Sequence, residues 1–269
     1  VELPREVAVA GELVARQFNL PRDEFTGNGH FPWQLYVREA RRLIGEYTLT
    51  ENDLIVGPAL GRTRVHADSI AAGEYPIDSF PVRKREPGHD VALEGYILML
   101  EKYTQPYQIP YRIMVPKDVD GLLVPVAAST THIAFSSIRL EPTWMALGQA
   151  AGTAAHLALR DRTPPRRVDV AGLQRELLRA GQVITFFKDI DRASPDYAAL
   201  QYFGSKGFFP DYFARAKEFI TPAIARDWLT RVPFATPSDH HAALLARVGR
   251  GEVTRGEFCR MLFENLFPP

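Results

Sequence analysis

The clearest chemical signal in this sequence lies at the start of a predicted helix that begins at Pro142. Proline suits the first turn of a helix, because its φ angle is already helical and its missing N–H would have no acceptor there. The first turn leaves backbone N–H groups free, here those of Thr143, Trp144 and Met145, and they carry a partial positive charge. We therefore expect this end of the helix to face an anion.

A second candidate group lies just upstream of the helix. Arg139 is the only formal charge between Asp120 and Glu141. It is either an ion-pair partner of Glu141 or a cation that faces a ligand. The apolar run 121–127 predicts a buried strand before it, so the unit has the order strand, polar loop, helix. Small residues share one face of the helix, which predicts close packing against a sheet or a cofactor; they are Gly148, Ala151, Gly152 and Ala155.

The elements that must position this unit are predicted from hydrophobic periodicity. Residues 4–20 have helical spacing, and residues 34–49 alternate as a long strand does. A further strand is expected from Val91 to Leu100. Residues 57–88 contain four glycines and four prolines, which predicts a long excursion without regular structure. A short amphipathic helix is expected at 173–181.

Composition excludes several classes of protein. The 269 residues carry 32 basic and 32 acidic side chains and are 46% hydrophobic, which favours a folded chain of one large domain or two smaller ones. Zero net charge gives no general attraction to nucleic acid or membranes, so we expect no nucleic-acid partner. One cysteine, Cys259, excludes an internal disulfide framework and a Cys-rich zinc site. Two uncharged stretches, 121–138 and 142–159, are too polar or too rich in Ala and Gly to predict a membrane span.

Two long blocks of the sequence resemble one family. The block YQIPYRIMVPKDVDGLLVPVAASTTHIAFSSIRLEPTWMALGQAAGTAAHLAL resembles the C-terminal FAD-contacting segment of the FAD-dependent oxidoreductases that are often labelled xanthan-lyase-like. The earlier block LPRDEFTGNGHFPWQLYVREARRLIGEYTLTENDL is similar to the middle region of the same family. The resemblance therefore runs from Leu20 to Leu159 and extends through the helix that ends near Gly181.

The resemblance implies that FAD is the cofactor and that the strand, loop and helix return to the flavin. It places the helix start at the N1 and O2 edge of the flavin, where the free N–H groups would stabilise the negative charge that develops on reduction. The cofactor-binding residues that it implies are Ala127, Ala128, Ser129 and Thr130 in the loop, and Pro142, Thr143, Trp144 and Met145 on the helix.

Catalysis by such an enzyme needs a positioned C–H donor, a base and the flavin. His132, in the loop beside the expected flavin, is either a proton acceptor or a hydrogen-bonded core residue. Arg112 either clamps a substrate carboxylate or ties strands together. The candidate catalytic residues are His30, Tyr111, Arg112, His132 and Arg139. We expect no metal site, and we assign the pair His240 and His241 to solvent because no third ligand has metal spacing.

One part of the family pattern is missing from the sequence. The pyrophosphate of FAD is held by a G-x-G-x-x-G turn, but neither Gly27-Asn28-Gly29 nor Gly249-Arg250-Gly251 continues to the third glycine. We therefore expect a partial fold that lacks the N-terminal dinucleotide-binding half, with that FAD-binding segment as a missing partner. The start at Val1, without an initiator methionine, fits this expectation of a fragment.

The region from Phe186 onward has a different pattern. Two hydrophobic-Thr pairs precede segments with helical spacing, so Thr221 and Thr254 are predicted N-caps. The segment FKDIDRASPDYAALQYFGSKGFFPDYFARAKEFITPAIARDWL resembles an S-layer-homology repeat. Its aromatic residues Phe208, Phe209, Tyr212, Phe213 and Trp228 are expected in the core.

Together these observations predict an α+β fold over residues 1–182, the C-terminal part of an FAD-dependent oxidoreductase, and a small all-helical S-layer-homology-like domain over residues 183–269. The expected activity is hydride transfer to flavin from a C–H donor in a small molecule or carbohydrate. Two alternatives stay open. One is a noncatalytic cell-envelope or glycan-binding module. The other is a polysaccharide lyase, in which Tyr111 is the base and Arg112 neutralises a uronate carboxylate for β-elimination.

Overall fold

The computed structural model describes residues 23–30, 39–57, 60–79, 81, 87–88, 96–100, 102–232 and 239–268. The chain forms two compact units, Val1–Ala40 and Arg41–Pro269. In the first unit, the described stretch 23–30 contains the short 3-10 helix η1 (Thr26–Asn28), which is flanked by Phe25 and Gly29 in the left-handed conformation. The helix expected at 4–20 lies outside the described residues.

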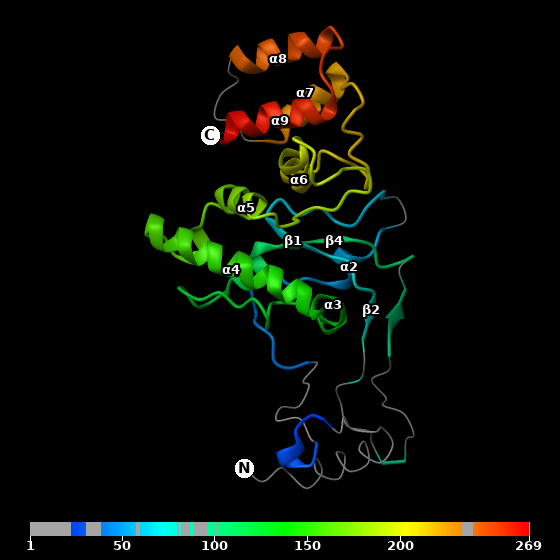
Figure 1. The fold of residues 1–269 in the computed structure, drawn as a ribbon, viewed down its shortest axis with the longest axis vertical. Coiled ribbons are helices and arrows are strands. Elements are labelled where there is room, and N and C mark those ends of the chain that lie inside the picture. Colours follow the sequence, from blue (N-terminus) through cyan, green and yellow to red (C-terminus); the bar gives the residue numbers. More distant parts are fainter. Residues whose placement is uncertain are drawn as a thin grey trace. The chain divides into compact units, whose positions relative to one another are not determined.

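The larger unit contains two small antiparallel sheets in its described part. Strand β1 (Ser69–Gly73) pairs with β4 (Tyr107–Pro110), and an irregularity near the start of β1 shifts the register. Strand β2 (Ile77–Asp78) pairs with β3 (Leu98–Met99). Figure 1 shows β1 and β4 side by side, with α4 across them. Helices and short strands in separate segments make this an α+β fold, as predicted.

Helices supply most of the regular structure. In chain order they are α2 (Glu51–Leu54), η2 (Tyr111–Met114), α3 (His132–Ile138), α4 (Glu141–Asp161), η3 (Pro165–Arg167), α5 (Val170–Arg179), α6 (Tyr197–Ser205), α7 (Pro222–Thr230), α8 (Asp239–Gly249) and α9 (Arg255–Leu266). The predicted N-caps Thr221 and Thr254 are confirmed, and α4 begins at Glu141, one residue before the predicted start at Pro142. Among the described residues, no helix has both the length and the apolar character that crossing a membrane requires.

Helix α4 packs on β1, but not through the face expected from its small residues. The buried side chains are Leu147, Ala150, Ala151, Ala154, Leu157 and Ala158. Of the predicted close-packing face only Ala151 is buried, whereas Gly148, Gly152 and Ala155 are exposed. The larger Leu147 and Leu157 side chains bury more apolar surface than glycine can, so they turn toward the sheet.

Two predicted strands are not formed. The described residues 39–49 make only isolated pairings, Gly45 with Pro116 and Leu49 with Thr130. The run 121–127 is irregular, and of its amides Val124 N–H donates to the Met114 carbonyl at 2.9 Å. A strand needs a neighbour along its whole length, and among the described residues the backbone bonds of these two segments are scattered over several partners and form no continuous ladder.

The loop that was expected between residues 128 and 140 contains a helix. Thr131 is the N-cap of α3, because its side chain accepts a hydrogen bond from the Ala134 amide. Most of α3 is buried, including Ser136 and Ser137. This short helix brings its polar side chains against β2 and against Tyr75, two residues before β2.

Two hydrophobic cores meet on α5. Leu173 and Leu177 belong to the core that contains β1, β4 and α4, and Leu178 belongs to the core of α6, α7, α8 and α9. Both faces of α5 are therefore covered. The predicted domain boundary at residue 182 lies just after this helix, and the division into two domains stays a prediction.

Polar contacts also join the two sides of that boundary. Ser69 Oγ donates to the Ile184 carbonyl at 2.6 Å, and Tyr212 Oη donates to the Pro106 carbonyl at 2.7 Å. Arg62 is buried, with its guanidinium over the Tyr212 ring at 5.1 Å. These contacts hold the residues after 182 firmly against β1 and β4, which positions one wall of the cavity described below.

The last helices form an aromatic core. Phe208 stacks on Trp228 at 4.6 Å and on Phe203 at 4.7 Å. Phe208, Phe209 and Trp228 are buried as expected, and so is Tyr212, whereas Phe213 is 42% exposed. The aromatic rings therefore stabilise the fold of this region and do not form an open binding platform.

Thr254→Ala is expected to lower the free energy of unfolding by about 1 kcal/mol. Thr254 and Glu257 form a capping box at α9, in which Thr254 Oγ1 accepts from the Glu257 amide and Glu257 accepts from the Thr254 amide. Urea unfolding at neutral pH measures the loss. Thr153→Ala, in the middle of α4, removes a hydroxyl without removing a cap; an equal loss in both variants would contradict the capping role.

Candidate functional site

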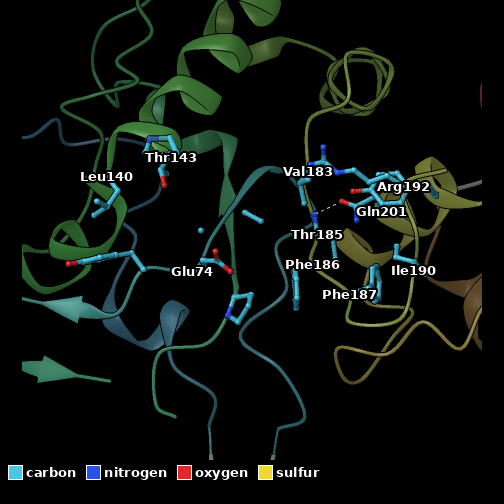
Figure 2. A pocket seen from close by; sticks show the side chains of 16 residues that line it. Glu74, Leu140, Thr143, Val183, Thr185, Phe186, Phe187, Ile190, Arg192 and Gln201 are labelled. Carbon is cyan, nitrogen blue, oxygen red and sulfur yellow. Dashed lines mark hydrogen bonds between the residues drawn. The ribbon is translucent and has the colours of Figure 1, made fainter. Parts of the chain in front are cut away.

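A cavity of about 620 Å³ opens at the first turn of α4. Its size is within the usual range of about 300 to 1,000 Å³ for small-molecule sites. Three parts of the chain supply most of its lining, as Figure 2 shows: the start of α4, the end of β1, and the segment between residues 183 and 201. Pro106, the residue before β4, completes the lining. The lining residues used below are Gly73, Glu74, Tyr75, Leu140, Pro142, Thr143, Thr185, Phe186, Phe187, Arg192, Tyr197 and Gln201.

The start of α4 differs from the sequence prediction. Leu140 is the N-cap and is extended, with no side-chain cap. The amides of Thr143 and Trp144 both donate to the Leu140 carbonyl, at 2.9 and 3.1 Å. These two N–H groups, which we expected to be free, are therefore already bonded. The Thr143 hydroxyl makes no hydrogen bond within the described part of the chain, and in Figure 2 it points into the cavity.

The end of β1 forms a second wall, and packing holds it rigidly. Gly73 lies against the ring of Tyr107, its partner in β4. Tyr107 Oη is hydrogen-bonded to Ser137 Oγ at 2.7 Å, and Ser137 Oγ in turn donates to the Tyr75 carbonyl. This chain of contacts fixes the backbone at Glu74, whose carboxylate is exposed at the rim of the cavity.

The third wall is apolar and is braced from behind. Gln201 Oε1 accepts from the amides of Ile184 and Thr185, at 3.0 and 2.8 Å, and Thr185 Oγ1 accepts from Gln108 Nε2 at 2.9 Å. Figure 2 shows the contact between Thr185 and Gln201 as a dashed line. The apolar side chains of this wall are Val183, Phe186, Phe187, Ile190 and Tyr197. The cavity therefore suits a flat ligand that is largely apolar, with polar groups only at its edges.

The eight residues predicted to bind the cofactor lie in different environments. Ser129 is in the core, where its amide donates to the Ile113 carbonyl at 2.8 Å and its carbonyl accepts from the Leu49 amide at 3.0 Å. Ala128 and Thr130, on either side, are also buried. Ala127 is half-buried and its carbonyl accepts from the Leu43 amide. None of these four residues lines the cavity.

The four residues on α4 that were predicted to bind the cofactor also lie in different environments. Pro142 and Thr143 line the cavity. Trp144 is half-buried and packs toward Phe135, with ring centroids 6.3 Å apart. Met145 points outward and is 74% exposed. Two of the eight predicted residues thus reach the cavity, and both lie in the first turn of α4.

Two predicted catalytic residues lie on α3, away from the cavity. His132 is the first residue of α3 and is half-buried. Arg139 is buried at the end of α3, with Nη2 3.8 Å from a carboxylate oxygen of Asp78. Neither side chain lines the cavity. The ion pair with Asp78 links α3 to β2, so Arg139 has a structural role in this fold.

Tyr111 and Arg112 do not form the joint site that a lyase would need. Tyr111 is buried, and its hydroxyl donates to the Pro165 carbonyl at 2.9 Å. Burial, followed by the nearby Glu46 carboxylate, raises the pKa of Tyr111 far above neutral pH, so its hydroxyl is a poor base. Arg112 forms an ion pair with Asp68 at 2.9 Å and lines another cavity.

Two other histidines from the sequence analysis, His30 and His241, lie outside the cavity. His30 belongs to the Val1–Ala40 unit, where its Nδ1 lies 2.9 Å from the Glu24 carbonyl. His241 is buried, with 8% of its surface exposed, so our assignment of this residue to solvent was wrong. Among the residues with a described placement, no group of three or more His, Cys, Asp or Glu could hold a metal ion.

Several lining residues were missed by the sequence analysis. Glu74, Phe186, Arg192 and Gln201 come from an irregular excursion and from a region that we assigned to another domain. No local motif marks them, because they meet only when the chain folds. Phe187 was noticed as part of a repeat pattern and not as a pocket residue.

Comparison with known proteins identifies the family. The FAD dependent oxidoreductase family matches residues 5–177, which is more than half of the 269-residue chain. The match includes β1 and the start of α4, and it ends within α5. No curated protein and no solved structure matches the chain. The chain belongs to the FAD-dependent oxidoreductase family, whose members are flavoproteins.

Proposed function

We propose that this chain is the C-terminal portion of an FAD-dependent oxidoreductase and that the cavity at the start of α4 receives the flavin edge and the substrate. The observation that carries the proposal is that Pro142 and Thr143, within the family match, line this cavity. Catalysis would consist of hydride transfer from a C–H donor. The xanthan-lyase-like resemblance favours a carbohydrate as that donor.

The residues at the start of α4 fit a flavin, whereas Ala127–Thr130, which were also predicted to bind it, do not. At the helix start, the cavity has apolar walls, and the Thr143 hydroxyl is available as a donor for a flavin oxygen. In the loop, the backbone groups of Ser129 are occupied by Ile113 and Leu49. Pro142 and Thr143 are therefore the residues that we assign to the cofactor.

FAD, when bound, supplies the acceptor for the hydride. The chain's own residues would do the rest. The N-terminal end of α4 stabilises negative charge near Thr143 through the helix dipole, an effect of about 0.3–1 kcal/mol at an exposed site. Phe186, Phe187 and Tyr197 exclude water from the ligand. Glu74, a carboxylate on the cavity wall, is placed to accept a proton from a substrate hydroxyl.

Two further parts of the proposal concern the whole protein. The pyrophosphate of FAD would be held by a dinucleotide-binding segment outside this sequence, because the 269 residues contain no G-x-G-x-x-G turn. Residues 183–269 would form an S-layer-homology-like helical domain. The capped helices α7 and α9 support this assignment. Its contacts with β1 and β4 indicate that it also completes the cavity.

Thr143→Val in the complete gene product is expected to weaken FAD binding about tenfold, because valine keeps the shape of threonine but removes the hydroxyl. Thr153→Val is the matched control on the same helix, where the hydroxyl donates to the Gln149 carbonyl outside the cavity. FAD is titrated into the apoprotein, and flavin fluorescence reports binding. Equal affinities for the two variants would contradict the assigned role of Thr143.

The visible absorption spectrum of the complete protein tests the proposal as a whole. A bound flavin that is bleached by an oxidisable sugar under anaerobic conditions would support it. A correctly folded, colourless protein that takes up no added FAD would refute it.

A further inference from the structure

A second cavity lies at the opposite end of β1. It has a volume of about 440 Å³, and Asp68, the residue before β1, lies in its wall. Gly73, at the other end of β1, lines the first cavity. The strand has five residues, so at about 3.3 Å per residue its two ends are roughly 17 Å apart. That separation excludes direct contact between a ligand here and a group at the start of α4. The residues of this second cavity are Tyr47, Arg64, Val65, His66, Ala67, Asp68, Arg112, Val170 and Lys206.

A buried carboxylate anchors the base of this cavity. Asp53 is fully buried and accepts hydrogen bonds from Tyr47 Oη at 2.7 Å and from the Thr50 amide at 2.9 Å. His66 Nε2 lies 3.2 Å from the same carboxylate. Its other ring nitrogen, Nδ1, makes no hydrogen bond to any described residue. Asp53 is thus occupied by neutral donors and His66, and it fixes Tyr47 and His66 in the cavity wall.

The cations of the cavity retain unused donors. Arg64 has a side chain that is 63% exposed, and its ion-pair contact is a long one, 3.8 Å to Asp53. Arg112 donates to Asp68 through Nε and Nη2, which leaves its Nη1 group unused among the described residues. Arginine presents five N–H donors in a planar fork, so both residues can still bind oxygen atoms of a ligand.

Lys206 is the third cation and has no carboxylate in contact within the described residues. Its Nζ donates to the Ala67 carbonyl and to Gln174 Oε1, the second at 2.8 Å. Burial lowers the pKa of Lys206 to about 8, against the opposite effects of Asp68 and Asp169. An anion in the cavity would offset the cost of burying this ammonium group.

We propose that this second cavity binds a small organic molecule through an oxyanion group, a phosphate or a carboxylate. Three cations, Arg64, Arg112 and Lys206, line the cavity, whereas Asp68 is the one acidic residue among the described residues of its wall. With the buried Asp53 at its base also counted, the cavity keeps one net positive charge, which fits an anion. Val65 and Val170 provide apolar surface for the carbon part of the ligand. The inference does not rest on the proposed function, because neither FAD nor the start of α4 takes part.

Isothermal titration with inorganic phosphate and with succinate, at constant ionic strength, tests the proposal. Saturable binding of at least one probe is expected, and Arg64→Gln should weaken it about tenfold by removing an exposed guanidinium. Arg160→Gln is the matched control, since Arg160 is an exposed arginine paired with Asp161 outside the cavity. Tighter binding of phosphate would indicate a phosphorylated ligand, and tighter binding of succinate a carboxylate ligand. The absence of saturable binding, or equal losses in the two variants, would overturn the proposal.

A second readout uses Lys206. The charged or titratable groups around its ammonium are His66, Asp68, Arg112, Asp169 and Tyr202. Since an anion favours the protonated lysine, binding should take up protons near pH 8, and affinity should fall as the pH rises above 8. Titration in two buffers with different ionisation enthalpies measures this uptake. Lys206→Met should abolish the uptake above pH 7; uptake that persists unchanged would show that Lys206 does not contact the ligand.

Discussion

Replacing Gly73 with alanine is expected to lower the free energy of unfolding by about 3 kcal/mol. A Cβ atom at this position would lie 2.6 Å from Cζ and Oη of Tyr107. The Tyr107 ring is buried with 1% exposure, so it cannot move aside into solvent. Any shift of the ring would also break the hydrogen bond between Tyr107 Oη and Ser137 Oγ. The loss would appear in urea unfolding curves and as a lower melting temperature.

A glycine with open space around it provides the control. Gly148 lies on the exposed face of α4, and a Cβ atom added there would meet nothing within 4 Å. Gly148→Ala should therefore stabilise the protein by roughly 0.5–1 kcal/mol, because alanine has the higher helix propensity. Tyr107→Leu should recover part of the loss caused by Gly73→Ala, since it removes the clashing atoms. Additive effects of the two substitutions would show that the ring is not the cause.

Asp53→Asn is expected to cost about 3 kcal/mol at neutral pH. The Asp53 carboxylate is fully buried and accepts hydrogen bonds from Tyr47 and from the amide and hydroxyl of Thr50. His66 Nε2 also lies beside it, at 3.2 Å. An asparagine keeps one acceptor oxygen and replaces the other with an NH2 group, which cannot accept. Either the Tyr47 hydroxyl or the Thr50 donors therefore lose their acceptor. The cavity that contains Tyr47 and His66 should lose its order as well.

The same residue predicts how stability depends on pH. Burial alone would raise the pKa of Asp53, but hydrogen bonds from His66, Thr50 and Tyr47 outweigh it and lower the pKa to about 2. The ordinary value is 3.8, so the folded state holds this proton less tightly than the unfolded state does. The resulting stabilisation, about 2 kcal/mol, is complete above pH 4 and is lost as the pH falls through 2.

Unfolding experiments between pH 7 and pH 2 measure this effect. The wild-type protein should lose stability steeply below pH 4, and Asp53→Asn should flatten that part of the curve. Asp161→Asn is the control, because Asp161 is an exposed partner of Arg160 on α4. An acid transition of unchanged steepness in Asp53→Asn would place the responsible carboxylate elsewhere.

Helix starts were predicted well from the sequence because their signals are local. Pro142 lies in the first turn of α4, and Thr221 and Thr254 cap α7 and α9. Each cap involves residues three positions apart, so a short window of sequence contains the whole interaction. The family resemblance also needed no structure, and the family match over residues 5–177 confirms it at the level of FAD-dependent oxidoreductases. The S-layer-homology resemblance stays a prediction.

Strands and site residues were predicted less well because their partners are distant in sequence. Residues 39–49 and 121–127 have the composition of strands, but the described structure pairs them only at single positions. The predicted loop residues Ala128–Thr130 pack in the core, and the cavity wall is completed instead by residues such as Phe186 and Gln201. Side-chain type alone could not distinguish a buried support from a lining residue.

The sequence by itself determined the family, the mixed α and β composition, and the position of the helix start that faces the first cavity. Only the tertiary structure decided which residues share a site. Arg64, Arg112 and Lys206 meet in one cavity although they are far apart along the chain. A helix cap depends on backbone groups within one turn, whereas a cavity depends on how separate segments pack, and that packing is set by the whole core.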